Sequence, residues 1–102
     1  MIIRKDAVYV PSEDIVAREI EGEIIIVPLA AGIGDMEDEL YALNETGKAI
    51  WKLLDGRKSL EGVIATLSHD FEAEPDEVEG DVLGLVEELL KRRMLVEAES
   101  VR

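Results

Sequence analysis

The chain has 102 residues, of which 47% are hydrophobic, and this length and composition fit one globular domain with a modest core. It carries 24 acidic residues against 11 lysines and arginines, so its net charge of −13 opposes binding to nucleic-acid phosphates. The absence of cysteine excludes disulfides and thiolate sites, and no apolar run is long enough to span a membrane.

The first part of the chain predicts an irregular lead-in followed by a β-hairpin. Residues 1–14 lack both a clear period and the apolar core of a signal peptide, so we expect an irregular segment and a cytoplasmic protein. Residues 15–20 and the β-branched run at 24–27 predict two strands. Glu21 and Gly22 between them fit a tight turn.

The next segment predicts a loop and a short third strand. Residues 30–38 contain two glycines and several acidic residues, which is typical of a flexible loop. Residues 40–43 then form an apolar run that leads into Asn44. We therefore expect a three-stranded antiparallel sheet that ends where the first helix begins.

Residues 43–56, Leu-Asn-Glu-Thr-Gly-Lys-Ala-Ile-Trp-Lys-Leu-Leu-Asp-Gly, predict that first helix in detail. Asn44 is a good N-cap because its side-chain oxygen can accept from the first free N–H groups of the helix. Trp51 shares one face with Ile50 and is expected in the core. A helical glycine at position 47 costs about 1 kcal/mol, which indicates close packing. Gly56 is suited to the left-handed end of the helix.

Two further helices follow. Ser59 can cap the second, whose apolar residues fall at helical spacing. These residues are Leu60, Val63, Ile64, Leu67 and Phe71. Pro75 fits the first turn of the third helix, and acidic residues early and basic residues late suit its dipole. Residues 95–96 suggest a last short strand.

The third helix has an apolar arc of roughly 160°, wider than the stripe of about 100° that a surface helix needs. Its centre line consists of Val78, Val82, Val86 and Leu89, with Leu85 on one flank and Leu83 and Leu90 on the other. The domain's own strands and helices could cover the whole arc. Alternatively, one flank could border a groove beside the third strand.

The order of these features resembles the PqqD family, named after protein D of pyrroloquinoline quinone biosynthesis. The resemblance covers about residues 15–96 and is most specific at residues 43–56. It implies an α+β, winged-helix-like fold in which an N-terminal three-stranded antiparallel sheet packs on three helices. On this basis we expect the domain at residues 15–97 and a short tail at 98–102.

The resemblance also implies a function, which is to bind the leader of a ribosomally made precursor peptide and present it to a modifying enzyme of the radical-SAM type. The leader would add as a strand against the third strand and lie in the groove beside the third helix. The expected peptide-binding residues are Glu39, Leu40, Tyr41, Ala42 and Leu43 on the strand and Asp81, Leu85 and Glu88 on the helix. Acidic residues in this groove would favour a leader with lysine or arginine.

We expect no catalytic residues, metal or cofactor. His69 is the only histidine and has no partner at a fixed spacing, and the many carboxylate pairs are unremarkable in so acidic a chain. Oxygen ligands for calcium cluster at residues 35–39, but their spacing is not that of an EF-hand loop. The basic run at residues 91–93 suits the helix dipole, and it could alternatively dock an acidic partner.

Two rival functions remain at this stage. A winged-helix DNA-binding protein would need a basic recognition helix, and no candidate helix is basic. A structural or dimerisation module could use the third strand to pair with a second copy, so we expect a monomer or weak homodimer.

Overall fold

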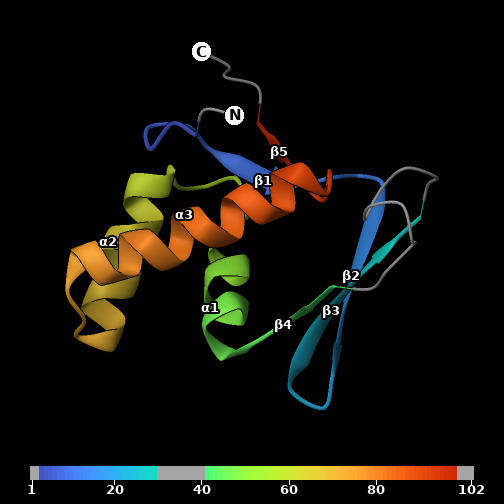
Figure 1. Cartoon of the computed structure of the whole chain (residues 1–102), viewed down its shortest axis with the longest axis horizontal. Coiled ribbons are helices and arrows are strands. Elements are labelled where there is room, and N and C mark those ends of the chain that lie inside the picture. The colour runs from blue at the N-terminus through green and yellow to red at the C-terminus, as the bar shows by residue number, and fades with distance from the viewer. Residues whose placement is uncertain (1–2, 30–40, 99–102) are drawn as a thin grey trace.

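The structure is a computed structural model that describes residues 3–29 and 41–98 (Figure 1). The elements in chain order are β1 (Tyr9–Pro11), β2 (Ile15–Ile20), β3 (Glu23–Pro28), β4 (Tyr41–Leu43), α1 (Glu45–Leu53), α2 (Leu60–Phe71), α3 (Pro75–Lys91) and β5 (Leu95–Glu97). The expected α+β, winged-helix-like fold is confirmed, because three helices pack together beside a three-stranded antiparallel sheet. No helix in these two described ranges is long and apolar enough to cross a membrane.

The three-stranded sheet has the order β2-β3-β4. Glu21 and Gly22 both have positive φ angles, 52° and 85°, which is the geometry of a two-residue turn between twisted strands. This turn sets the register of the hairpin, in which Ile20 lies opposite Glu23. On the other side of β3, Ile25 pairs with Ala42 of β4. The loop expected at 30–38 lies outside the described residues, as do Glu39 and Leu40.

The lead-in at residues 1–14 is not wholly irregular, contrary to our expectation. Tyr9–Pro11 forms β1, which pairs with β5 in a separate two-stranded antiparallel sheet. Tyr9 is only 3% exposed, so this segment belongs to the core. The carbonyl of Ala7 also accepts from the backbone N–H of Leu60, at the start of α2. The pairing joins segments at opposite ends of the chain, which a local residue pattern cannot reveal.

The helix caps follow the sequence closely. The side-chain oxygen of Asn44 accepts from the backbone N–H of Gly47 at 2.7 Å, and Ser59 caps α2 in the same way. Pro75 occupies the first turn of α3, where its missing N–H removes no helical hydrogen bond. Gly56 has a φ of +90°, as expected, although α1 itself ends at Leu53.

The core lies where the three helices meet the inner faces of the strands. The whole centre line of α3 is buried, and so are Ile50, Trp51 and Leu54. On α2 the first four residues of the apolar face are also buried. Phe71, the fifth residue at this spacing, is 60% exposed and therefore lies outside the core. It stands in the last turn of α2, at the edge of the helix contact.

Candidate functional site

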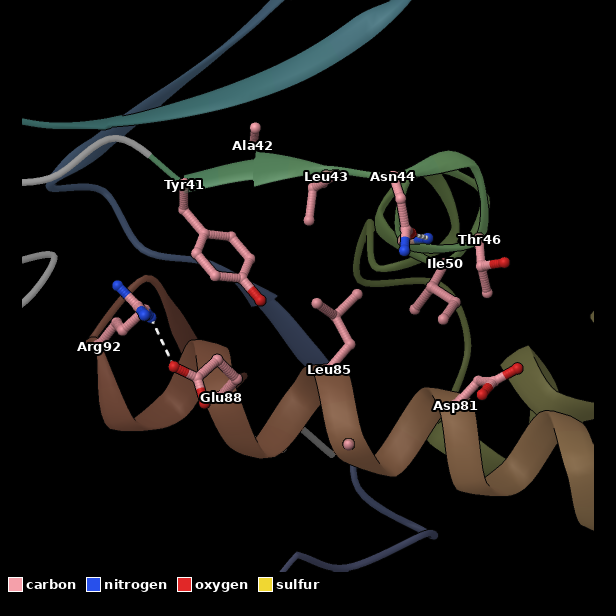
Figure 2. Close-up of a pocket in the computed structure, with 12 residues that line it drawn as sticks. Tyr41, Ala42, Leu43, Asn44, Thr46, Ile50, Asp81, Leu85, Glu88 and Arg92 are labelled. Carbon is pink, nitrogen blue, oxygen red and sulfur yellow. Dashed lines mark hydrogen bonds and ion pairs between the residues drawn. The ribbon is translucent and has the colours of Figure 1, made fainter.

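A groove of about 570 Å³ separates β4 from α3 (Figure 2). The start of α1 borders one end of it. The lining residues are Tyr41, Ala42, Leu43, Asn44, Thr46, Gly47, Ile50, Asp81, Gly84, Leu85, Glu88 and Arg92.

One wall of the groove is the edge of a sheet. In the described part of the chain β4 pairs with β3 alone, so its other edge has no strand beside it. Tyr41 and Leu43 point from β4 toward α3, whereas the side chain of Ala42 points away (Figure 2). This alternation is the ordinary period of a strand. The main-chain groups on the outer edge of β4 have no strand partner among the described residues.

The opposite wall is the flank of α3 that carries Asp81, Leu85 and Glu88. These residues follow one another at spacings of four and three, so they share one helix face. Leu85 points across the groove toward β4 (Figure 2). It also packs against the core, as Leu83 and Leu90 do on the other flank, but only Leu85 of these three lines the groove.

The structure therefore brings together six of the eight residues predicted for this site: Tyr41, Ala42, Leu43, Asp81, Leu85 and Glu88. The other two, Glu39 and Leu40, lie outside the described residues. That these side chains bind a peptide stays a prediction.

A guanidinium group spans the groove at one end. The Nε atom of Arg92 donates to Oε2 of Glu88 at 2.7 Å, and the guanidinium carbon lies 4.7 Å from the centre of the Tyr41 ring. Cation–π contact favours this stacking. Arg92 thus contacts both walls, so it does not project freely into solvent as a simple dipole-compensating residue would.

The charge of the groove differs between its ends. Arg92 compensates Glu88 near the C-terminal end of α3. Toward the N-terminal end, Asp81 has no ion pair with any other described residue. Glu45 lies on the adjacent first turn of α1. The end near Asp81 is therefore the acidic end.

Two glycines line the groove for different reasons. A Cβ atom on Gly47 would lie 3.2 Å from Oδ1 of Asn44 and 3.3 Å from Cδ2 of Leu43, which is the close packing expected at this position. A Cβ atom on Gly84 would meet nothing within 4 Å. No packing constraint therefore explains a glycine in the middle of α3. Because Gly84 has no side chain, it leaves space in the groove beside the helix backbone.

Sequence reasoning missed several lining residues, among them Gly84 and Arg92. A glycine at the centre of an otherwise good helix was a usable signal, because it costs about 1 kcal/mol of helix propensity. The spacing of Glu88 and Arg92, four residues apart, was another, because a glutamate placed before an arginine at this spacing favours an ion pair.

The residues considered for catalysis do not assemble into a site. The side chain of His69 is 92% exposed and lies 3.6 Å from Asp70, its sequence neighbour. Within residues 3–29 and 41–98, no group of three or more histidines and carboxylates is placed to hold a metal. The possible calcium ligands at 35–39 lie outside this range.

Comparison with known proteins identifies the family. The model for coenzyme PQQ synthesis protein D (PqqD) matches residues 23–95, which is more than half of the chain. The chain belongs to the PqqD family. The match includes β3, the described groove residues from Tyr41 to Arg92, and the start of β5. No curated protein matches the chain.

Two solved structures share the PqqD-like fold. The first is TbiB1 in complex with the TbiA(beta) leader peptide, with a TM-score of 0.71 and 20% identity; the match covers 89% of this chain and 99% of that one. The second is the PqqD truncation of Methylobacterium extorquens PqqCD, a stand-alone recognition element for ribosomally synthesised and post-translationally modified peptides. Its TM-score is 0.72 at 20% identity, with 93% and 95% coverage.

Proposed function

We propose that this protein is a recognition element that binds the leader of a ribosomally synthesised precursor peptide. The observation that carries the proposal is the open edge of β4, which faces α3 across a groove. The leader adds to β4 as a further strand, and its side chains contact Leu85 and the neighbouring surface of α3. Membership of the PqqD family and the fold shared with a leader-peptide complex support this function.

The expected energetics suit reversible binding. Each backbone hydrogen bond to β4 contributes about 0.5–1.5 kcal/mol net, and each buried aliphatic side chain contributes about 1.5–3 kcal/mol. Ordering a flexible peptide offsets part of this gain. The balance corresponds to micromolar binding, for which the free energy is about −8 kcal/mol.

The groove's charge indicates which leaders it prefers. Asp81 is unpaired among the described residues, whereas Glu88 is compensated by Arg92. We expect a lysine or arginine of the leader to lie near Asp81, and an uncharged residue to lie near the Glu88–Arg92 pair. The net charge of −13 adds a general preference for basic peptides.

The bound leader is presented to a separate modifying enzyme of the radical-SAM type. In this scheme the protein performs no chemical step itself, because holding one strand of the substrate in place requires only the edge of β4 and the groove. Since the precursor is a ribosomal product, we place this function in the cytoplasm.

The test is an NMR titration of the ¹⁵N-labelled protein with the leader of the precursor peptide encoded nearest its gene. We expect amide shifts at Tyr41–Leu43 and around Leu85 that saturate at micromolar peptide. A scrambled leader of the same composition is the control, because it keeps the charge and changes only the order of side chains.

Equal shifts with the scrambled leader would mean that the peptide binds through unspecific charge attraction, which would contradict sequence-specific recognition. No shifts with either peptide at millimolar concentration would contradict it. Sedimentation of the same sample would then show whether β4 pairs with a second copy, and a duplex-DNA titration would test the remaining rival function.

A further inference from the structure

A second cavity, of about 250 Å³, lies beyond the acidic end of the groove. Its lining is mostly apolar: Ile50, Leu67, Phe71, Ala73 and Val78, with Glu45, Thr46 and Asp81 at its rim. Ligand cavities for drug-sized molecules generally range from about 300 to 1,000 Å³. This cavity is below that range, so its size suits one large side chain better than a cofactor.

The second cavity adjoins the groove. Thr46, Ile50 and Asp81 line both, so these three residues form the boundary that the two spaces share. Its outer side is formed by Phe71, an aromatic residue that leaves 60% of its surface exposed. Contiguous exposed apolar surface rimmed by polar residues marks interaction sites, and here the exposed ring adjoins the apolar lining of the cavity.

The strand directions determine which end of a peptide reaches the cavity. The sheet is antiparallel at both of its interfaces, so a strand that joins β4 is expected to run antiparallel to it. β4 runs from Tyr41 to Leu43 and then into Asn44 and α1. A residue opposite Leu43 therefore precedes one opposite Tyr41, and the part of the peptide before the paired segment passes Thr46.

We propose that this cavity binds a large apolar side chain, aliphatic or aromatic, located N-terminal to the strand-pairing segment of the same leader peptide. The inference rests on the proposed function, because the peptide reaches the cavity through the groove. The acidic rim adds a preference for a lysine or arginine between the apolar residue and the paired segment, next to Asp81. The peptide chain that follows the leader leaves at the opposite end, beside Tyr41 and Arg92.

The test compares two synthetic peptides: the leader encoded nearest the gene, and the same leader with every large apolar residue before the paired segment changed to alanine. NMR contacts to Tyr41–Leu43 define the paired segment. We expect the alanine peptide to bind about ten-fold more weakly, and the amides of Leu67, Ala73 and Val78 to shift only with the unchanged leader.

Two protein variants complete the test. Phe71→Ala removes an exposed ring, so this variant should fold normally. It should bind the unchanged leader more weakly than the parent protein does, and its affinity for the alanine peptide should change little. Ile20→Ala is the control, because Ile20 is also half exposed, at 50%, but lies at the far turn of the hairpin. Ala73→Leu, which fills the cavity, should act like Phe71→Ala.

The outcomes separate the two proposals. If both peptides bind equally and shift Tyr41–Leu43, the cavity proposal is wrong and the recognition function stands. The same conclusion follows if Phe71→Ala behaves like Ile20→Ala. If neither peptide shifts Tyr41–Leu43, both proposals are wrong.

Discussion

Arg92 lies over the ring of Tyr41, with its guanidinium carbon 4.7 Å from the ring centre. Tyr41 is the first residue of β4, and Arg92 follows the last residue of α3. The contact therefore connects the two walls of the groove at one end, and the hydrogen bond to Glu88 holds the guanidinium in place. At the other end Asp81 and Thr46 line both the groove and the second cavity.

Replacing Arg92 by alanine should lower the free energy of unfolding by about 1 kcal/mol, because it removes a partly exposed cation–π contact and an ion pair at a spacing of four residues. Urea unfolding measures this loss. Lys91→Ala is the matched control at the same helix end, since the described residues show no ion pair for Lys91. Equal stability of the two variants would mean that the contact with Tyr41 contributes nothing measurable.

Gly84→Ala should raise the free energy of unfolding by about 0.5–1 kcal/mol, because alanine favours the helix and its methyl group meets no neighbour. Gly84→Phe should also fold, but its ring should fill the groove and abolish leader binding.

Gly80 provides the control for both changes at position 84. It also has open space around a Cβ atom, but it does not line the groove. Gly80→Phe should therefore bind the leader like the parent protein. Calorimetry gives the affinities, and normal binding by Gly84→Phe would show that the leader does not occupy this part of the groove.

Leu85→Ala and Leu83→Ala distinguish the two flanks of α3. Both side chains are partly buried against the core, so both changes should reduce stability to a similar degree. Only Leu85→Ala should also weaken leader binding, by about ten-fold, since Leu85 alone of the two lines the groove. A larger loss of binding in Leu83→Ala would move the site to the other flank.

Asn44→Ala should destabilise the protein by about 1 kcal/mol, because the N–H of Gly47 loses its acceptor. Asn44→Asp should retain stability, since a carboxylate oxygen can accept the same hydrogen bond and suits the helix dipole. Thermal unfolding of the two variants and the parent protein measures these differences in stability. If alanine and aspartate were equally harmful, the amide group of Asn44 would have a role other than capping.

The features that sequence reasoning predicted well are those encoded by neighbouring residues. The caps at Asn44 and Ser59, the turn at Glu21 and Gly22, and the position of Pro75 each depend on a few adjacent positions. The shared face of Asp81, Leu85 and Glu88 follows from helical spacing alone. The family resemblance indicated a groove beside the third helix, but helical spacing could not decide between this flank and that of Leu83 and Leu90; the structure places Leu85 in the groove.

The features that sequence reasoning missed depend on contacts between distant parts of the chain. The pairing of β1 with β5 joins Tyr9 to Glu97, and no local pattern in either segment specifies the other. Phe71 continues the period of α2 but is 60% exposed, so periodicity alone does not show where the helix contact ends. Arg92 fits a dipole rule in sequence, whereas its contact with Tyr41 exists only once β4 and α3 are packed together.

The position of α3 also limits how much of a sheet can form. An unpaired strand edge is a template to which one chain after another can add, as in fibrils. Among the described residues, the groove beside β4 has α3 as its opposite wall, so a strand added in the groove would lie between β4 and this helix. On the proposed function, we expect this helix to limit the complex to one peptide per protein, so that an open edge serves recognition without growth into a polymer.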